Sequence, residues 1–517
     1  MPGFEIEFTP QFSKALHMME NGTRSVFVTG KAGTGKSTLL RYFRDHTAKK
    51  IVVLAPTGVA ALNVGGETIH SFFSFQPDIT ASAVKKVRGK WAQIYKELDA
   101  LVIDEVSMAR ADLMDCVDAF MRLNGRDAAL PFGGAQLILI GDLYQLPPVV
   151  TGAERGLFCG FYDGPYFFSA AAFKELELEF VELEKIYRQT DSGFIAILNA
   201  IRNNNITAAQ LAALNSRVGA PQKAGLGCAV HLLTTNAAAF TVNHDRLEEL
   251  QGKEYRYAAE IDGDFTRDSY PAEQHLRLKR RAQVMMLNND PDGRWVNGTM
   301  AEVAEVIRGI GGEPDTVLVR LPDGGLEGVQ PHDWELFHFT FNHEAGRIEA
   351  ETAGTFRQYP LKLAWGVTIH KSQGKTFDRV TLDLGDRAFA AGQTYVALSR
   401  CVSLEGLSLT RAVRPGDVIT DRRIVKFVTG HQYMLSDRAL PLAQKVELIS
   451  KAIKEGRCLG LTYLKAGDEK SRRKVRPLAV GERSYMQVSF IGLDAHCLEH
   501  GKDRLFRVDR ILELEII

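Results

Sequence analysis

The sequence predicts an α/β fold built on parallel sheets, with β-rich parts added to it. Short apolar runs alternate with helix-prone segments over most of the chain, and a turn bearing Gly, Pro or Asp follows each of the first runs. This alternation is typical of parallel sheets covered by helices. The pattern changes to short β-like stretches with Gly-rich turns at about 276–341, and again after Gly456. At 517 residues, the chain has room for three or four domains.

Composition limits the class of protein. The 63 Lys and Arg balance 63 Asp and Glu, so a polyanion must be held by local basic patches. Hydrophobic residues make up 45% and charged residues 24%, which argues against wholesale disorder. No apolar run reaches membrane-spanning length, and the amino end lacks the pattern of a secretory signal. Six cysteines without a CxxC pair indicate neither a zinc site nor a disulfide framework. We therefore expect a soluble, cytoplasmic, multidomain protein.

Two sets of apolar runs predict two sheets. The first set comprises residues 25–28, 51–54, 101–103 and 136–140. The second set comprises residues 231–233, 362–365, 380–383 and 407–409. Ligands of such sheets bind at the carboxyl ends of the strands. Two α/β units of similar kind suggest a duplicated core.

A phosphate-binding loop follows the first run. Residues 30–37, GKAGTGKS, satisfy G-x-x-x-x-G-K-[ST] between a predicted strand and a predicted helix. Glycines let the backbone wrap a phosphate, Lys36 is expected to reach the β- and γ-phosphates, and the Ser37 hydroxyl is expected to bind magnesium. The expected nucleotide contacts are Gly30, Ala32, Gly33, Thr34, Gly35, Lys36, Ser37 and Thr38.

Two acidic residues end the predicted strand at 101–103. Asp104 is placed to hold the magnesium ion, and Glu105 to orient and deprotonate the attacking water. Acidic residues at strand ends are often solvated turns, but beside a phosphate loop the catalytic interpretation is favoured. Together these motifs predict a nucleoside-triphosphate hydrolase.

Six further motifs narrow the prediction. They are 55–61 (APTGVAA), 68–73 (TIHSFF), 141–149 (GDLYQLPPV), 187–189 (YRQ), 368–374 (TIHKSQG) and 395–400 (YVALSR). In this order the chain resembles superfamily 1B DNA helicases, and most closely the PIF (petite integration frequency) family. Residues 104–139, with DEVSM and FGGAQLIL, and 284–299, with VMMLNN and WVNGT, favour this family over RecD-like relatives. The resemblance covers roughly residues 8–412.

The resemblance implies further residues at the nucleotide. Gln11 resembles the adenine-reading glutamine of the family, and Gln145 resembles its γ-phosphate sensor. Arg188 and Arg400 resemble the arginines that reach the γ-phosphate from the second core domain and neutralise charge in the transition state. The alternative for any single arginine is a surface ion pair. Gln373 and Gly374 are also expected to approach the nucleotide.

The same resemblance implies a groove for single-stranded DNA. Its expected residues are Thr57, His70, Phe72, Asn297, Thr368, His370 and Lys371. Hydroxyls and a lysine suit phosphates, and aromatic rings suit base stacking. Phe73 and Phe75 are expected in the core instead. For the basic runs 85–90 and 279–281, DNA contact and a solvated face both stay open.

The carboxyl-terminal residues 451–517 carry 14 Lys and Arg against 10 Asp and Glu, a surplus of four positive charges. Residues 461–463, 476–478, 485–487 and 504–511 resemble a WYL domain, although the Trp-Tyr-Leu triplet itself is absent. A nucleic-acid or nucleotide patch and an ordinary charged surface are both open interpretations of its arginines. These are Arg473, Arg476, Arg504, Arg507 and Arg510.

The expected architecture is therefore two RecA-like P-loop domains with a small β-barrel insert and a β-rich, WYL-like carboxyl-terminal domain. The first RecA-like domain is expected at 1–180, with a wedge insert near 62–95, and the second at 181–275 and 350–415. The barrel is expected at 276–349, a helical linker at 416–450 and the WYL-like domain at 451–517.

The resemblance implies a bacterial-type, ATP- and magnesium-dependent DNA helicase. It would translocate 5′→3′ on single-stranded DNA and unwind forked or structured DNA in genome maintenance, without a membrane partner and as a monomer when free. Two alternatives stay open: a RecD-like helicase, and an ATP-driven switch that remodels proteins on DNA without processive unwinding.

Overall fold

The computed structural model describes residues 6–76, 79–89, 92–150, 158, 160–189, 191–221, 229–263, 265, 270–342, 347–485 and 488–517. The chain forms two compact units, residues 1–202 with 206–419 and residues 203–205 with 420–517. Among the helices in these ranges, none is both long and apolar enough to cross a membrane.

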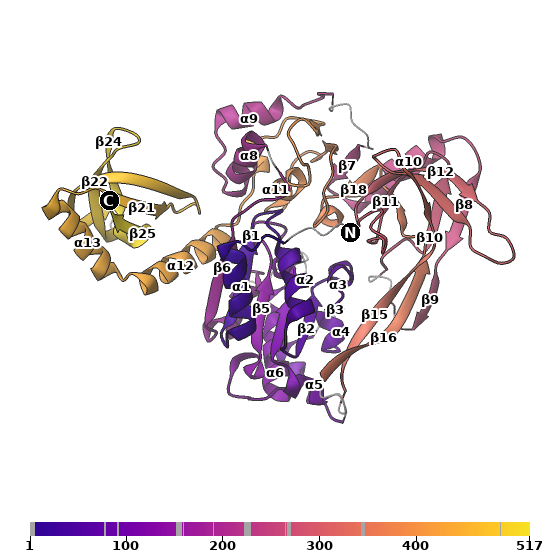
Figure 1. Cartoon of the computed structure of the whole chain (residues 1–517), viewed down its shortest axis with the longest axis horizontal. Coiled ribbons are helices and arrows are strands. Elements are labelled where there is room, and N and C mark those ends of the chain that lie inside the picture. The colour runs from indigo at the N-terminus through magenta and orange to yellow at the C-terminus, as the bar shows by residue number, and fades with distance from the viewer. Residues whose placement is uncertain are drawn as a thin grey trace. The chain divides into compact units, whose positions relative to one another are not determined.

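The first core is a six-stranded parallel sheet in the order β3-β2-β4-β5-β1-β6 (Figure 1). Its strands are β1 (Ser25–Gly30), β2 (Ile51–Ala55), β3 (Glu67–Thr68), β4 (Ala100–Ile103), β5 (Gln136–Ile140) and β6 (Leu178–Leu183). The four predicted strands are confirmed. β6 pairs with β1, so the first core extends to Leu183, past the expected boundary at 180.

Helices cover this sheet. They are α1 (Pro10–Asn21), α2 (Lys36–His46), α3 (Gly58–Val64), α4 (Ile69–Phe72), α5 (Ala92–Glu97) and α6 (Ala111–Asn124). α1 and α2 bury Phe12, Leu39 and Phe43 against the β1 residues Val26 and Val28. This packing fixes the start of α2, and with it the loop that joins β1 to α2.

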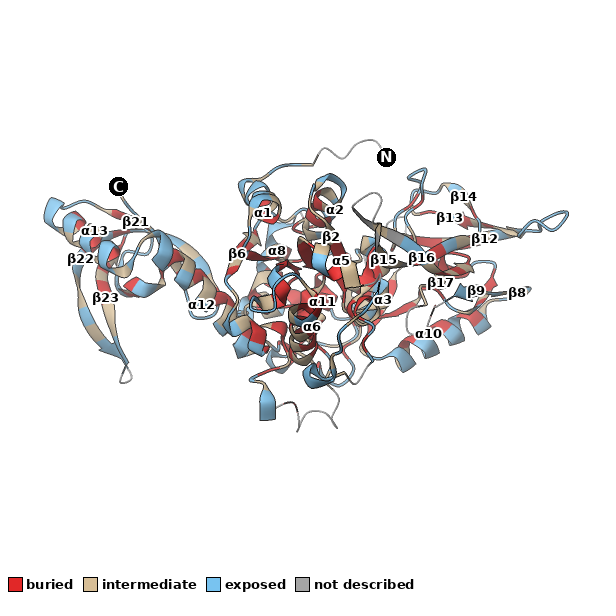
Figure 2. Cartoon of the chain, turned by 90° about the horizontal axis from the view of Figure 1, so that it is seen from below, coloured by how far each residue is buried: buried red, intermediate tan, exposed pale blue. Residues whose placement is uncertain are grey.

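The second core is a four-stranded parallel sheet in the order β18-β7-β19-β20. Its elements are β7 (Val230–Leu233), β18 (Gly366–Thr368), β19 (Val380–Leu382), β20 (Leu407–Leu409), α8 (Ser192–Arg202), α9 (Ala208–Asn215), α10 (Asn236–Glu249) and α11 (Gln393–Leu398). α10 buries Ala239, Asn243 and Leu247, which recur every four residues and form one helix face. In Figure 2 the ribbon of α10 is coloured as buried at intervals along a mostly exposed helix.

The predicted strand at 362–365 is wrong as a member of this sheet. Residues Leu361–Leu363 form β17, which joins an antiparallel sheet, and the parallel sheet receives β18, which begins at Gly366. The chain changes sheets within three residues, because the Ala364 N–H donates to Gln283 in one sheet while the Trp365 carbonyl accepts from His231 in the other. A continuous apolar run does not encode such a change.

Antiparallel strands interrupt the second core between α10 and β18. They are β8 (Glu254–Ala258), β9 (Glu260–Gly263), β10 (His275–Lys279), β11 (Gln283–Met286), β12 (Met300–Ile307), β13 (Thr316–Arg320), β14 (Leu326–Val329), β15 (His332–Asn342), β16 (Arg347–Gln358) and β17. Leu276 and Leu278 of β10 share one core with β11, β12 and β13. The insert thus runs from Glu254 to Leu363, beyond the expected 276–349 on both sides.

The β15–β16 hairpin of the insert reaches the first core (Figure 1). The carboxylate of Glu67, only 1% exposed, contacts Nδ1 of His338 at 2.8 Å and accepts from the Phe339 N–H at 3.3 Å. Phe339 also packs on Phe72 of α4. These contacts join the insert to the domain that carries the phosphate loop.

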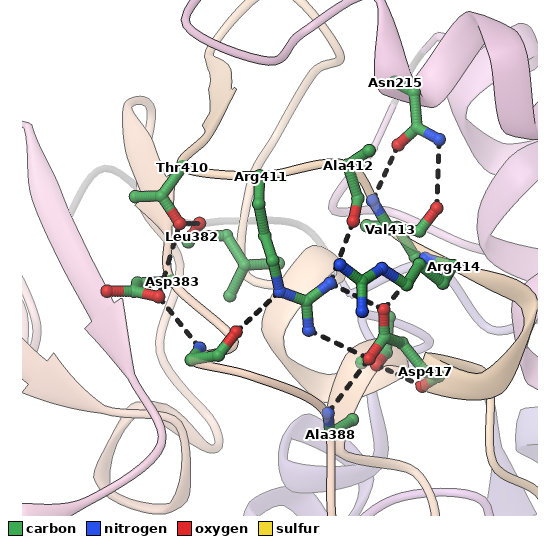
Figure 3. Close-up of polar contacts among 12 residues, drawn as sticks. Asn215, Leu382, Asp383, Ala388, Thr410, Arg411, Ala412, Val413, Arg414 and Asp417 are labelled. Carbon is green, nitrogen blue, oxygen red and sulfur yellow. Dashed lines mark hydrogen bonds and ion pairs between the residues drawn. The ribbon is translucent and has the colours of Figure 1, made fainter.

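Asp417 holds together the last segment of the first compact unit (Figure 3). Its carboxylate, 2% exposed, accepts two bonds from the Arg411 guanidinium and one each from the N–H groups of Ala388 and Arg414. Burial opposes the charge, but these bonds prevail and lower the pKa of Asp417 to about 2. The neighbouring Val413 is fixed by two bonds to the Asn215 side chain.

The second compact unit contains two helices and an antiparallel sheet in the order β24-β23-β22-β21-β25. Its elements are α12 (Arg422–Ala439), α13 (Leu442–Glu455), β21 (Leu459–Leu464), β22 (Lys470–Tyr485), β23 (Val488–Cys497), β24 (Lys502–Arg507) and β25 (Ile511–Ile516). Ile449 and Ala452 of α13 pack against Leu461, Val475 and Leu493 of the sheet. The predicted β-rich carboxyl-terminal part is confirmed.

Candidate nucleotide site and nucleic-acid groove

The loop between β1 and α2 has the conformation that a phosphate cradle requires. Gly35 precedes α2 in the left-handed region (φ 89°), and Gly33 is also left-handed (φ 79°). A Cβ on Gly33 would lie 2.5 Å from Cβ of Arg188, so only glycine allows that residue to approach the loop. Ser37 and Thr38 are exposed in the first turn of α2, where helix N–H groups point outward to an anion.

Lys36 folds back over this loop. Its Nζ donates to the carbonyls of Gly30 at 2.7 Å and Lys31 at 3.0 Å. Burial lowers the pKa of Lys36, and the carboxylates of Asp142 and Glu105 oppose that effect. The ammonium therefore lies inside the loop with a buried carboxylate cluster beside it, the position that suits a β- or γ-phosphate contact.

The predicted carboxylate pair lies at the end of β4. Asp104 is 7% exposed, and burial followed by repulsion from Glu105 raises its pKa to about 7. Glu105 adopts a left-handed backbone (φ 48°), uncommon for a residue with a side chain. Burial also raises the pKa of Glu105, while Lys36 and Arg400 oppose that shift. Two crowded carboxylates of this kind favour a cation or a shared proton.

Gln373 connects the two cores at this point. Its Nε2 donates to Oε2 of Glu105 at 3.1 Å and to Oε1 of Gln145 at 2.9 Å. Gln145 in turn donates to Oδ2 of Asp142 at 3.3 Å. The predicted γ-phosphate sensor, the predicted base and a motif of the second core thus form one polar chain.

Both predicted arginines lie at the same junction. Arg188 donates to the carbonyls of Ser399 at 3.4 Å and Gly374 at 3.3 Å. Arg400 is 1% exposed and donates to Val396, to Ser399 and, at 3.3 Å, to the Lys375 carbonyl. Burial and then Arg188 lower the pKa of Arg400 to about 9. An anion between the two guanidinium groups would reduce their mutual repulsion.

Three polar residues of the site received no role from the sequence. The Tyr395 hydroxyl accepts from the Ala32 N–H of the phosphate loop at 3.1 Å. Asp142 is fully buried. Tyr395 and Asp142 belong to the motifs at 395–400 and 141–149, and this membership is the sequence signal that could have marked them. Arg202 contacts Asp142 at 3.8 Å and lies 3.7 Å from the Tyr144 ring centroid. It ends α8, outside every motif, so no sequence signal marked it.

Gln11 lies in the first turn of α1 and is half-buried. Thr9 caps this helix by accepting from the Phe12 N–H at 3.2 Å. Phe8, just before the cap, packs edge-to-face on Tyr42 of α2 at 5.3 Å. The predicted adenine reader therefore belongs to a helix that packs on the helix of the phosphate loop.

The predicted groove residues Thr57 and Thr368 occupy equivalent places in the two cores. Thr57 follows β2 and accepts from the Ala60 N–H at 3.3 Å, and Thr368 ends β18 and accepts from the Lys371 N–H at 3.3 Å. Lys371 is exposed, and His370 is half-buried. In each core, therefore, a threonine hydroxyl at the carboxyl end of a strand accepts a backbone hydrogen bond from the turn that follows.

Phe72, which is predicted to stack on bases, is buried in this conformation. Phe72 is 4% exposed, and its ring packs on Phe73 at 4.8 Å, Tyr95 at 5.4 Å and Phe339 at 6.2 Å. The short helix α4 places this ring inside a cluster of aromatic side chains. Phe73 and Phe75 are buried, as predicted.

His70, on the same short helix, is half-buried. Burial and then Arg110 lower its pKa, which favours the neutral ring. A neutral imidazole offers one donor and one acceptor and does not act as a fixed cation.

The two basic runs differ in their surroundings. Lys85, Lys86 and Arg88 are exposed, and Asn124 anchors their backbone by contacts to residues 85 and 87. Lys90, the last residue of that run, lies outside the described residues. In the other run Lys279 is 8% exposed and donates to the Leu250 carbonyl, so its ammonium is already held at the end of α10.

Comparison with known proteins agrees with this geometry. Residues 11–211 match the PIF1-like helicase family, and residues 444–516 match the WYL domain. The chain is 36% identical to the ATP-dependent DNA helicase PIF1 of Homo sapiens over 441 residues, which are 83% of this chain but only 64% of that protein. It is 33% identical to the ATP-dependent DNA helicase Pif1 of Bdellovibrio bacteriovorus over 438 residues, 83% of this chain and 93% of that protein.

Solved structures extend the likeness to three dimensions. The crystal structure of Bacteroides sp Pif1 in complex with ADP-AlF4 has a TM-score of 0.75 and 33% identity, covering 83% of this chain and 98% of that one. Bacteroides Pif1 bound to ssDNA has a TM-score of 0.60 and 34% identity, covering 82% and 96%. The chain therefore belongs to the PIF1-like helicase family and carries a WYL domain at its carboxyl end.

Proposed function

We propose that this chain is an ATP-dependent DNA helicase that moves along single-stranded DNA and unwinds forked DNA. The observation that carries the proposal is the polar chain Glu105–Gln373–Gln145, because it joins the predicted base to a motif of the other core. A nucleotide bound there touches both cores, so hydrolysis changes how they fit together. Relatives support this: Bacteroides Pif1 has been solved with ADP-AlF4 and with ssDNA, and a related structure concerns unwinding at forked dsDNA.

The residues present divide the chemistry among them. Lys36 and the loop N–H groups hold the phosphates, Glu105 orients and deprotonates water, and Arg188 and Arg400 neutralise charge as the γ-phosphoryl group departs. Burial raises the pKa of Glu105 above its ordinary value, which makes its carboxylate a stronger base toward water.

We propose magnesium as the metal of this site. Asp104 and Ser37 fit it, because a buried carboxylate with a raised pKa lacks charge compensation and both groups offer the hard oxygen ligands that magnesium prefers. When bound, the ion supplies charge neutralisation at the β- and γ-phosphates.

ATPase and strand-separation assays test the proposal. Single-stranded DNA should stimulate hydrolysis, and a fork with a 5′ tail should be unwound in preference to one with a 3′ tail. The 5′→3′ direction and a role in genome maintenance rest on the family resemblance alone. Stimulated hydrolysis without strand separation would instead favour the DNA-bound switch, and no stimulation would contradict both.

The WYL domain adds a second, electrostatic surface. The five arginines of the predicted patch do not lie together: Arg473 and Arg476 are three positions apart on β22, so they point to opposite faces. Arg473 pairs with Glu499 at 2.8 Å, and Arg507 pairs with Asp509 at 2.6 Å. The arginines therefore form no single patch, and two of them are neutralised locally.

A different row of cations fits a polyanion. Arg472, Lys474 and Arg476 alternate along β22, all exposed and on one face. Alternate residues of a strand are about 6.8 Å apart, twice the roughly 3.4 Å of helix axis that each phosphate of one strand occupies in duplex DNA. We infer that this row holds a nucleic-acid strand, or the phosphates of a nucleotide, by charge.

A further inference from the structure

Lys375 lies between the candidate nucleotide site and the candidate DNA groove. Its main-chain carbonyl accepts from Nη1 of Arg400 at 3.3 Å, and the carbonyl of the preceding Gly374 accepts from Nη2 of Arg188 at 3.3 Å. Two consecutive carbonyls thus hold the two arginines that face the γ-phosphate position. A displacement of this backbone changes where both guanidinium groups lie.

The Lys375 side chain extends the other way and forms a bridge through Asn297 to Asn63. Its Nζ donates to Oδ1 of Asn297 at 2.6 Å, and Nδ2 of Asn297 donates to Oδ1 of Asn63 at 3.0 Å. Asn63 belongs to α3 of the first core, Asn297 to the insert between β11 and β12, and Lys375 to the second core. The Lys375–Asn297–Asn63 bridge therefore joins all three parts.

Two cavities meet at this bridge, and both Asn297 and Lys375 line each of them. The larger, about 430 Å³, also exposes Arg379 and one carboxylate, Asp378. The smaller, about 230 Å³, has no acidic residue among those that line it. Its polar and aromatic lining includes Asn63, Asn288, Asn289, His332 and Trp334. Amides, aromatic rings and a cation are the groups that bind single-stranded nucleic acid.

We propose that Lys375 is a phosphate contact for single-stranded DNA, and that a DNA phosphate replaces Asn297 at its ammonium. The inference rests on the proposed helicase function, because that function brings a strand into this groove. A phosphate is the stronger acceptor, because its negative charge attracts the ammonium directly, whereas the amide oxygen of Asn297 is neutral. Its arrival frees Asn297, and with it Asn63, which opens the wall that the two cavities share.

The same contact links DNA to hydrolysis. Because the Lys375 carbonyl holds Arg400, a shift of this residue on binding DNA moves an arginine of the nucleotide site. Linkage requires the effect to be reciprocal: if DNA changes the affinity for a transition-state mimic by some factor, the mimic changes the affinity for DNA by the same factor. Lys375 is in this sense a positioning residue for Arg400.

The protonation of Lys375 supports this role. Burial and then the neighbouring Lys362 lower the pKa of Lys375 to about 8. Lys362 also has a pKa of about 8, and Arg379 and Asp378 share the larger cavity. A bound phosphate favours the charged ammonium and raises the pKa, so binding takes up a proton near pH 8. DNA affinity should therefore fall as the pH rises from 7 to 9.

The test compares wild type with Lys375→Met, Lys375→Arg and Lys362→Met. Lys362→Met is the matched control. It removes a neighbouring lysine of similar pKa, but the bond to Asn297 comes from Lys375 and is kept. Binding of a labelled oligothymidylate is measured against salt and pH, with and without ADP-AlF4. Lys375→Met should flatten the slope of log K against log salt by about 0.7, the value for one phosphate of a single strand. In the Lys375→Met variant, ADP-AlF4 should also leave the affinity for DNA nearly unchanged.

The other variants should separate charge from titration. Lys375→Arg should keep the salt slope but lose part of the fall between pH 7 and 9, because a guanidinium stays charged. Lys362→Met should keep the effect of ADP-AlF4. Lys375→Met with a wild-type salt slope and a wild-type ADP-AlF4 effect would overturn the inference.

Two controls complete the design. If thermal unfolding shows that Lys375→Met is not folded, Lys375→Gln gives the same readouts. Wild-type ATPase that single-stranded DNA fails to stimulate would contradict the helicase proposal itself, so the two failures are distinguishable.

Discussion

Gln373 holds the Glu105 carboxylate from the opposite core, with its amide nitrogen 3.1 Å from Oε2. The residue predicted to activate water is therefore oriented by a side chain from the loop after β18. Hydrolysis in this arrangement requires both cores to be in place, because neither contains the base together with its orienting partner. Gln373→Ala should lower turnover more than it lowers ATP affinity.

Exchange of Lys36 for alanine should abolish hydrolysis. The β- and γ-phosphates lose the cation that the loop carbonyls of Gly30 and Lys31 now hold in place. DNA affinity, measured without nucleotide, should be close to wild type, because the groove residues belong to other segments. DNA-stimulated hydrolysis at an ordinary rate in this variant would show that the phosphate loop has been misassigned.

Glu105→Gln should bind ATP yet hydrolyse it slowly. The amide keeps the shape of the side chain but cannot accept a proton from water. Nucleotide affinity and single-turnover hydrolysis, measured side by side, separate the two effects. Turnover at the wild-type rate would place the general base elsewhere.

Arg400→Ala should reduce turnover by about 10³ or more, the scale of a transition-state arginine. Since Arg400 is buried and donates to Val396 and Ser399, its loss also removes structural bonds. Arg400→Lys is therefore the companion variant, because it keeps a cation without the planar fork. Thermal unfolding checks that both variants fold, and rapid hydrolysis by a folded Arg400→Ala would reduce the residue to a structural role.

Asp417→Asn should destabilise the first compact unit by about 2 kcal/mol at pH 7. The Asp417 pKa of about 2 lies below its ordinary value of 3.8, so ionised Asp417 contributes stability above pH 3.8. That contribution is lost as the pH falls from about 3.8 to 2. Urea unfolding of both proteins should give a difference that shrinks over this range and is constant above pH 5.

Exchange of Arg472, Lys474 and Arg476 for glutamine should weaken DNA binding by the WYL domain. The slope of log K against log salt should flatten by about 0.7 for each single-strand phosphate that the domain no longer binds. Truncation after Ile419, where the first compact unit ends, should have at least as large an effect, whereas ATPase without DNA should persist, because every predicted ATP contact precedes Cys401. Equal exchange of Arg473, Arg507 and Arg510 is the control. Unchanged affinity and slope in the row variant and the truncation would point to a protein-contact or ligand-sensing role for this domain.

The strands and the nucleotide loop were predictable because each has a local cause. Buried parallel strands need continuous apolar runs, and a phosphate loop needs glycines at fixed places followed by a helix. Thr57 and Thr368 were likewise marked by motifs that cap the next turn.

Features that depend on contacts between distant segments were harder to predict from the sequence. The run 362–365 says nothing about which sheet it joins, and that choice depends on Gln283 and His231 far away in the chain. From the sequence, the Phe72 ring was expected to be available for base stacking. In the structure, Phe339 of the insert packs on it. Arg202 follows no motif, and only the folded chain brings it to Asp142. Each of these misses concerns a tertiary contact between segments that composition and spacing do not relate.

The position of the insert also constrains the order in which the chain folds. β7 pairs in parallel with β18 although Leu233 and Gly366 are more than 130 positions apart. Closing so long a loop costs chain entropy, and the cost falls when the intervening residues have already collapsed. The hairpins from β11 to β14 pair with near neighbours in sequence, so they can form early during synthesis. We expect the insert to fold before the second core. Its folding would bring β18 close to β7, which has already been synthesised, and so help the two strands to pair.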